Sequence, residues 1–469
     1  MNKQRMLWLL LSVVLVMSLL LAACQPAAPQ APAEEPAAEE PAEEPAAEEP
    51  AEEPAMDEKP FAGVELNLLQ ETVPDLDYFR EFIPEFEEQT GMKVNIEEVT
   101  YTAMHEKLVP QLSLGEGQGS YDVIEVDKQW VGEFMCADWL LPLDDYIERD
   151  GFDTSVYVPA LFDMIGQVNG VTYMLPYYNY TTGLVYRTDI FEDPEIQAAY
   201  EEEFGQPLKV PETLDEYVET AKFLTMDTDG DGEIDQYGAA MQLARFPSYG
   251  EFAHLLFVQD GWYYDDEWNA AVNDEKGMKA INSLIDMYKN ATTEAATGYF
   301  FNEQLEFFNQ GNAAMIITYS VMPALIDNPE FSEVAGKIDL STAPFGMQGG
   351  WGWAIPKSAP NPDAAWEFIK WVESPEIAKK RAMLGGAATR LDVLEDPEVL
   401  AAFPFQETIR EWLKTGKPFP IVCRSQEIID TLSLNVSEAL AGTKDPQAAM
   451  DEAAEVLNDI VAEDPLVNK

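Results

Sequence analysis

The chain has 469 residues, which is enough for two or three domains with substantial hydrophobic cores. It contains 86 Asp and Glu against 28 Lys and Arg, so its formal net charge is −58. Nucleic-acid binding depends on basic side chains that neutralise phosphates, and this balance of charge excludes that class of function. We therefore expect a very soluble acidic surface and no nucleic-acid partner.

The first 23 residues have the pattern of a secretory signal peptide. Lys3 and Arg5 precede an apolar run over 7–21, which is short for a membrane span. The run ends in Leu-Ala-Ala-Cys over 21–24, which is similar to a bacterial lipobox, a motif whose cysteine is lipidated and becomes the new N-terminus. We therefore expect residues 1–23 to be removed and Cys24 to hold an extracytoplasmic protein at the cell membrane.

Residues 24–58 consist largely of Pro, Ala and Glu in repeats of the EEPA type. Apolar residues larger than Ala are nearly absent, so this segment cannot form a core. Its prolines and repelling charges favour an extended chain. We interpret residues 24–58 as a disordered tether between the anchor and the folded part.

From residue 64 onward the sequence predicts strands that alternate with helices. The expected elements are a strand at 64–68, a helix at 77–89, a strand at 94–99, a helix at 101–114 and a strand at 121–126. Such alternation predicts α/β lobes, whose ligands bind beyond the carboxyl ends of the strands. Asp127, Lys128 and Trp130 follow the last of these strands directly, which places them at a cleft.

The stretch Met-Leu-Pro-Tyr-Tyr-Asn-Tyr-Thr-Thr-Gly-Leu-Val-Tyr over 174–186 joins tyrosines, polar side chains and a β-branched run. We expect the chain to bend at Pro176 and Gly183. The stretch resembles the first hinge crossing of the bacterial family 1 extracellular solute-binding proteins, the sugar-binding components of ABC importers. One difference is Arg187, because the family usually has Asn or Asp after the tyrosine.

Two further motifs strengthen this resemblance. Phe-Asn-Gln-Gly-Asn-Ala-Ala-Met over 308–315 leads into a short β-branched run, and Gly-Gly-Trp-Gly-Trp-Ala-Ile-Pro over 349–356 is followed by an amphipathic helix. The resemblance covers about residues 60–465. It implies a two-lobed α/β fold of the type II periplasmic-binding-protein kind, with discontinuous lobes joined by a three-crossing hinge near 176–183, 345–350 and 386–390.

The implied boundaries are 59–180 plus 349–388 for the N-terminal lobe and 181–348 plus 389–469 for the C-terminal lobe. The resemblance further implies a monomeric receptor that is not an enzyme. It would bind a carbohydrate, most simply an oligosaccharide, in the cleft between the lobes and deliver it to ABC transporter permease subunits. Solute would favour the closed state of the hinge.

Sugars present apolar faces that stack on aromatic rings and hydroxyls that bind carboxylates, amides and guanidinium groups. The hinge and the strand ends would deliver ten such residues, of which we expect about half to touch the solute: Asp127, Lys128, Trp130, Tyr177, Tyr180, Tyr249, Glu251, Tyr319, Trp351 and Arg390. The acidic protein disfavours anionic solutes, unless Lys128 or Arg390 reverses that preference locally.

An acidic turn over 227–235 fits the spacing of a calcium-binding loop of the EF-hand type. Its carboxylates stand at positions 1, 3, 5 and 9, with Gly232 at position 6 and a backbone carbonyl at position 7. The candidate ligands are Asp227, Asp229, Asp231, Glu233 and Asp235. Position 12, where a bidentate Glu usually completes the site, is Gly238, so a structural Ca2+ would need a remote ligand or water.

Two questions stay open in the sequence. Cys136 and Cys423 can form a disulfide or remain as two buried thiols. The alternative functions are a calcium-dependent extracellular glycoside hydrolase and a surface carbohydrate sensor or adhesin. The chain has only two histidines, His105 and His254, and neither an HExxH nor a GxSxG motif, which disfavours the common hydrolases.

Overall fold

The computed structural model describes residues 59–403 and 405–467. The expected signal peptide, Cys24 and the tether lie outside the described residues. Within the described part, no helix has both the length and the apolar character needed to cross a membrane.

A nine-stranded sheet forms the centre of the described chain, with the strand order β2-β1-β3-β10-β6-β8-β7. Two short strands lie off this order, since β11 pairs with β10 and β9 pairs with β6. The strands are β1 Glu65–Glu71, β2 Lys93–Val99, β3 Val123–Asp127, β6 Leu175–Arg187, β7 Tyr237–Ala240, β8 Ala313–Tyr319, β9 Ile338–Leu340, β10 Met347–Ala354 and β11 Lys417–Pro418. Strands β1, β2 and β3 are parallel, whereas β10 and β6 run antiparallel to their neighbours in the order.

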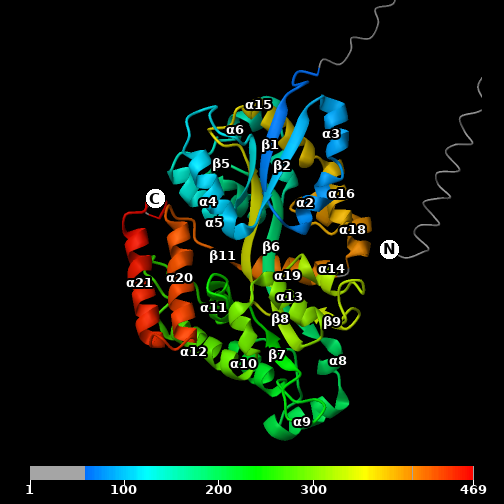
Figure 1. Ribbon diagram of the computed structural model, residues 1–469, viewed down its shortest axis with the longest axis vertical. Coiled ribbons are helices and arrows are strands. Elements are labelled where there is room, and N and C mark those ends of the chain that lie inside the picture. Colours follow the sequence, from blue (N-terminus) through cyan, green and yellow to red (C-terminus); the bar gives the residue numbers. More distant parts are fainter. Residues whose placement is uncertain (1–58, 404, 468–469) are drawn as a thin grey trace, which may run out of the picture. The chain divides into compact units, whose positions relative to one another are not determined.

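Two large hydrophobic cores divide this part of the chain into two lobes. The first core draws its residues from 66–180 and 351–377, and the second from 184–347 and 419–461. Strands β6 and β10 contribute to both cores, since Leu175 and Trp353 belong to the first and Leu184 and Met347 to the second. These two strands therefore connect the lobes (Figure 1).

The first lobe covers its strands with helices and carries the small β4–β5 hairpin (Gln167–Val168 and Val171–Thr172). Its helices are α2 Pro74–Arg80, α3 Ile83–Thr90, α4 Tyr101–Leu112, α5 Lys128–Cys136, α6 Asp144–Asp150, α7 Pro159–Leu161, α15 Pro362–Val372 and α16 Pro375–Met383. The single helix expected at 77–89 is thus two helices. Pro84 stands in the first turn of α3, where its missing N–H costs nothing, and so it starts a new helix.

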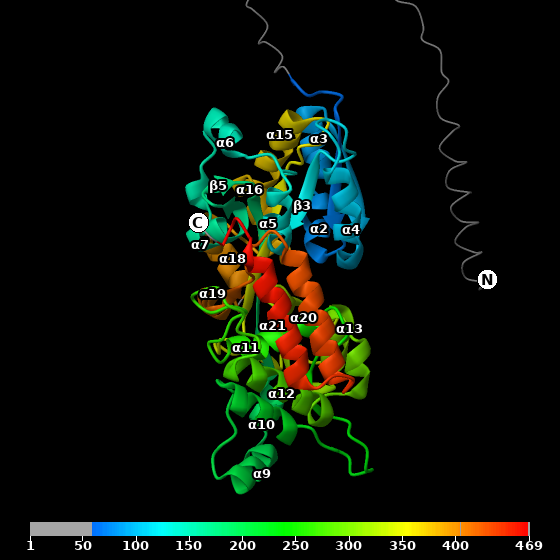
Figure 2. The same cartoon turned by 90° about the vertical axis from the view of Figure 1, so that its left-hand side faces the viewer.

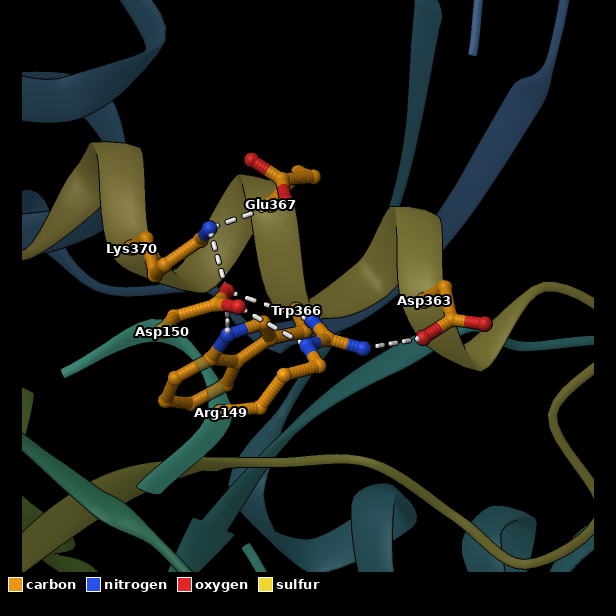
Figure 3. A network of polar contacts seen from close by, with 6 residues as sticks. All are labelled: Arg149, Asp150, Asp363, Trp366, Glu367 and Lys370. Carbon is orange, nitrogen blue, oxygen red and sulfur yellow. Dashed lines mark hydrogen bonds and ion pairs between the residues drawn. The ribbon is translucent and has the colours of Figure 1, made fainter. Parts of the chain in front are cut away.

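A polar network fixes α6 against α15 at the surface of the first lobe (Figure 3). The Asp150 carboxylate accepts hydrogen bonds from Trp366 Nε1 at 2.9 Å and from Lys370 Nζ at 2.6 Å. Arg149 donates to Asp150 and bridges to Asp363 at 2.8 Å. The hydrogen bonds from Arg149 and Lys370 hold the pKa of Asp150 well below its ordinary value. The network joins segments more than 200 residues apart in sequence.

The second lobe is mostly helical around β7, β8 and the far half of β6. Its helices are α8 Thr188–Phe191, α9 Pro194–Phe204, α10 Leu214–Phe223, α11 Ser248–Phe257, α12 Glu275–Asn290, α13 Phe301–Asn309, α14 Met322–Ile326, α19 Gln406–Thr415, α20 Ser425–Leu440 and α21 Pro446–Ala462. Thr213 and Glu216 form a capping box at the start of α10. Figures 1 and 2 show α20 and α21 side by side at the end of the chain.

The bend expected at Gly183 is wrong, because Gly183 pairs with Thr318 of β8 inside the continuous strand β6. Near Pro176 the strand is irregular: its register with β10 shifts by one residue between Tyr178, which pairs with Trp351, and Pro176, which pairs with Gly352. Gly183 is required for a different reason: a Cβ at this position would lie 2.0 Å from Cε2 of Trp412. The indole of α19 thus packs flat on the backbone of β6, and only glycine leaves room for it.

The expected last crossing at 386–390 is also wrong. Helices α17 Leu391–Leu394 and α18 Pro397–Ala402 share a small core with α16, formed by Ala378, Ala382, Val393 and Val399. In addition, Thr389 Oγ1 donates to the Pro176 carbonyl. The chain packs on the second lobe only from α19 onward, where Trp412 joins the core around Val185. Residues 389–402 therefore pack with the first lobe, because their apolar side chains cover α16.

The structure decides the question of the cysteines. Cys136, at the end of α5, forms a disulfide with Cys423, and their Cα atoms are 5.6 Å apart. The same stripe of α5 carries Lys128 and Gly132, spaced four residues apart, and both lie against the segment 419–423. Helix α5 is thereby fixed to the segment that leads into α20.

Candidate ligand-binding cavity

A cavity of about 130 Å³ lies where the two cores meet at β6 and β10, and both lobes contribute to its walls. The sheet register explains why these residues converge. Trp351 of β10 pairs with Asp127 on one side and with Tyr178 on the other, and Thr182 of β6 pairs with Tyr319. Five of the ten predicted residues line the cavity: Asp127, Tyr180, Tyr249, Tyr319 and Trp351.

Asp127 is the centre of the polar groups in this cavity. It ends β3 and caps α5, because its carboxylate accepts from the Gln129 amide at 3.1 Å. The hydroxyls of Tyr101 and Tyr180 each donate to it at 2.9 Å. Burial raises the pKa of the Asp127 carboxyl to about 6, although these three hydrogen bonds lower it. The side chain is only 1% exposed, so its charge is held by hydrogen-bond donors and not by water.

Gln129 connects the two lobes across the cavity, and the sequence reasoning missed it. Its amide nitrogen donates to Tyr180 Oη at 3.0 Å, and its amide oxygen accepts from Tyr249 Oη, also at 3.0 Å. Tyr249 lies on α11 of the second lobe, so this bond joins the lobes directly. The sequence position of Gln129 could have indicated this role, because Gln129 stands between Lys128 and Trp130 after the same strand.

Aromatic rings form most of the remaining wall. Tyr101 packs against Phe246 of the second lobe with 5.6 Å between ring centroids, and Tyr180 packs edge-on against Tyr319 at 5.7 Å. The rings that the sequence reasoning missed are those of Tyr101, Tyr178, Phe246, Phe300 and Phe301. Gly349 makes room for Tyr180, since a Cβ there would lie 2.3 Å from the ring. The arrangement offers ring faces and hydroxyl groups together.

Glu251 lies behind the cavity wall. Its carboxylate accepts from the Gln242 amide at 2.9 Å and from Gln304 Nε2 at 3.2 Å. It also stands 3.8 Å from Nδ1 of His254, a residue that does line the cavity. His254 Nε2 contacts Thr182 Oγ1 at 3.0 Å, so Glu251 orients the floor of the cavity and does not face it.

Four other predicted residues do not line the cavity. Lys128 donates to the Phe419 carbonyl, and burial lowers its pKa to about 7. Trp130 donates its indole N–H to Gln426 Oε1 at 3.2 Å. Both point away because successive side chains of a helix cannot share the face used by Gln129.

Tyr177 and Arg390 belong to the interior of the first lobe. Tyr177 packs 4.3 Å from the Trp353 ring, on the side of β6 opposite to Tyr178 and Tyr180. Arg390 donates to the Glu373 carbonyl at 2.8 Å and pairs with Asp392 at 2.7 Å. The expectation that Arg390 faces the solute is therefore wrong, since its guanidinium is already held by partners within the lobe.

The acidic turn over 227–235 brings together three of its five predicted carboxylates. Oxygen atoms of Asp227, Asp229 and Asp235 lie within 4.8 Å of one another. The amides of Gly232 and Gly230 bind the Asp227 carboxylate and lower its pKa. Gly232 has a φ of 95°, so it provides the tight turn that such a loop needs. A side chain at Gly238 is excluded, because its Cβ would lie 1.7 Å from the Ala221 carbonyl oxygen.

Comparison with known proteins defines the class of this chain. Residues 71–379 match the model of the bacterial extracellular solute-binding protein family, and the chain belongs to this family. Its members are solute-binding proteins and not enzymes, and the two lobes described above form the type II fold of such proteins.

Individual relatives are distant in sequence, but their similarity to this chain extends over most of its length. A probable amino-acid ABC transporter periplasmic-binding protein of Sinorhizobium fredii is 24% identical over 84% of this chain and 88% of its own length. The mannitol-binding protein of Pseudomonas aeruginosa is 26% identical over 65% of this chain and 70% of its own. A solute-binding protein of Agrobacterium radiobacter, solved in complex with ribitol, superposes with a TM-score of 0.75 at 28% identity, over 85% of this chain and 99% of that one.

Proposed function

We propose that this protein is the solute receptor of an ABC importer and that it binds a carbohydrate in the cavity between its lobes. The observation that carries the proposal is the convergence of Asp127, Gln129 and Tyr249 among aromatic rings from both lobes. Ring faces suit the C–H faces of a carbohydrate, and the carboxylate and amide suit its hydroxyls. The names of several relatives, among them the mannitol-binding protein, support the same class of solute.

The size of the cavity supports a small solute. It measures about 130 Å³, which is close to the roughly 150 Å³ of an engineered cavity that holds benzene. This volume suits a polyol or a single sugar ring in the conformation described here. An oligosaccharide, which the sequence led us to expect, would not fit within this cavity alone.

The mechanism follows from the bond that Tyr249 makes with Gln129. Because this bond joins the lobes, it exists only when they are close, and a solute that contacts both walls stabilises the same arrangement. Solute thus shifts the population towards the closed form. The closed form is then the one that permease subunits distinguish from the open form, and release follows when the lobes separate.

We also infer that Cys24 carries a lipid and that residues 24–58 act as a spacer between the membrane and the folded part. The lipobox-like sequence and the Pro, Ala and Glu repeats support this inference. Mass spectrometry of the membrane-bound native protein should show a lipid on Cys24 and loss of residues 1–23. An unmodified Cys24 in that protein would refute lipid anchoring at this residue.

A structural calcium ion at the acidic turn is a further proposal. The converging oxygens of Asp227, Asp229 and Asp235 and the turn at Gly232 support it. Titration calorimetry should detect calcium binding that Asp229→Ala abolishes and the exposed, distant replacement Glu116→Gln leaves unchanged. Solute affinity should stay the same in Asp229→Ala, and a loss of solute affinity with folding retained would contradict a purely structural role.

The experiment for the main proposal is titration calorimetry of the full chain, purified in mild detergent, against polyols, monosaccharides and short oligosaccharides. We expect one small carbohydrate to bind and to remain chemically intact. The variant Tyr249→Phe should bind the same solute more weakly, whereas Tyr186→Phe, outside the cavity, should bind it normally. Absence of binding by every carbohydrate would refute the proposal.

A further inference from the structure

Among the residues that the structure describes, Lys, Arg, Asp and Glu are represented in the lining of the cavity by carboxylates alone. Two carboxylates line it, those of Asp127 and Glu71, and the described lining residues include neither Lys nor Arg. Lys128 follows Asp127 in sequence, yet its ammonium group donates to the Phe419 carbonyl instead. Arg390, the other cation expected at the cleft, is held by Glu373 and Asp392.

The charges of Asp127 and Glu71 both affect Tyr319, which lines the cavity from the second lobe. Tyr319, at the end of β8 in the second lobe, has its pKa raised by burial and then by the charges of Asp127 and Glu71. Asp127 itself is 1% exposed. A buried carboxylate is costly, and the hydrogen bonds from hydroxyls and an amide together with the charge of the neighbouring Lys128 offset only part of that cost, because burial still raises the pKa of Asp127.

The uncharged part of the wall is suited to a positive charge as well. Aromatic faces attract cations through the ring quadrupole, and the cavity is lined by tyrosine, phenylalanine and tryptophan rings from both lobes. The negative field of a chain with a net charge of −58 also raises the local concentration of cations and lowers that of anions.

We propose that the solute is a small carbohydrate that carries a protonated amino group, namely an amino polyol or an amino sugar, and that its ammonium group binds between Asp127, Glu71 and the aromatic rings. This inference rests on the proposed function, because it names the solute class of the same cavity. It goes beyond the proposed function because it specifies that the solute carries a positive charge. Anionic sugars are rejected, since neither Lys nor Arg is among the described residues of the wall to meet their charge.

Two series of related carbohydrates test the charge with little change in the size of the ligand. The open-chain series is 1-amino-1-deoxysorbitol, sorbitol and gluconate, and the ring series is glucosamine, glucose and glucuronate. Titration calorimetry of the full chain at pH 7 measures each Kd. We expect the amine of at least one series to bind at least tenfold tighter than its neutral counterpart, and the acids not to bind.

Variants then test whether the carboxylates of Glu71 and Asp127 cause the preference for the amine over the neutral ligand. Glu71→Gln should reduce the preference for the amine by about tenfold while neutral binding changes less, and Glu116→Gln, in an exposed turn, should leave the preference unchanged. Asp127→Asn should remove the preference, and its circular dichroism spectrum shows whether the variant is folded. If it is not folded, Glu71→Gln alone decides.

The outcomes separate this inference from the proposed function. If in both series the neutral carbohydrate binds as tightly as its amine, or if an acid binds at all, the charge inference is overturned and the carbohydrate receptor is left standing. Equal effects of Glu71→Gln on amine and neutral ligands overturn it too. Absence of binding by any carbohydrate overturns the proposed function itself.

Discussion

The disulfide between Cys136 and Cys423 should be a major source of stability, and its removal by Cys136→Ser together with Cys423→Ser tests this. The two residues are 287 positions apart. In the chain-entropy model, a cross-link over a loop of this length destabilises the unfolded state by about 5–6 kcal/mol. Thiol-to-hydroxyl replacement is nearly isosteric, so the folded state should change little.

The expected shift in melting temperature follows from the size of the chain. At roughly 2.1 cal/mol/K per residue, some 410 residues unfold with an entropy of about 0.9 kcal/mol/K. A loss of about 5 kcal/mol therefore lowers Tm by about 6 °C if both lobes unfold together. The relevant assay is differential scanning calorimetry of the native protein and of the double serine variant, each with and without reductant.

The control lies within the same experiment. Reductant should lower the Tm of the native protein to that of the double variant and should not affect the variant itself. Mass spectrometry after thiol alkylation verifies the state of the cysteines. Equal Tm values for the oxidised native protein and the double variant would refute the reasoning, because the loop would then contribute no entropy difference.

Three further predictions concern the hinge and the cavity. Burial raises the pKa of Asp127 from 3.8 to about 6. Ionisation of this carboxyl therefore favours the unfolded state, and its contribution to the free energy of unfolding should fall by roughly 3 kcal/mol as pH rises from about 4 to 6. The difference in stability between the native protein and Asp127→Asn, measured by urea unfolding across this range, should fall by that amount, and parallel curves would contradict the assignment. Gly183→Ala should destabilise the protein by about 2–4 kcal/mol in urea unfolding, because its Cβ would overlap Trp412. Gly298 has open space around it, so the control Gly298→Ala should change stability by less than about 1 kcal/mol. Equal effects of the two replacements would contradict the explanation by packing. Tyr249→Phe should lower solute affinity about fivefold to tenfold, because it removes the hydrogen bond to Gln129 that joins the lobes. An unchanged Kd in titration calorimetry would show that this bond does not contribute to closure.

The hydrophobic pattern and a few motifs predicted much of the fold. Alternating strands and helices indicated α/β lobes, and Thr213 with Glu216 indicated the start of α10, as observed. Asp127 was placed at the cleft because it follows a buried strand, and the carboxyl end of β3 does border the cavity. These features depend on residues close in sequence, so local rules suffice for them.

The choice of cavity residues shows where local rules were incomplete. Side chains of a strand alternate between its faces, so Tyr177 and Tyr180 of β6 could not both face one cavity. The period of two alone would have favoured Tyr178. After β3, helical geometry directs Gln129 inward and Lys128 and Trp130 elsewhere, but the sequence does not say which face of α5 meets the cavity.

Other features were decided only by tertiary structure. The bond from Arg390 to the Glu373 carbonyl, the pairing of Cys136 with Cys423, and the contact that makes Gly183 necessary all join segments at least 17 residues apart. The sequence by itself determined the class of fold, the acidic character and the strand end that borders the cavity, because these follow from periodicity and composition. Which side chains share a space was settled by packing, since that depends on the register of β3, β10 and β6 and on where distant helices lie against them.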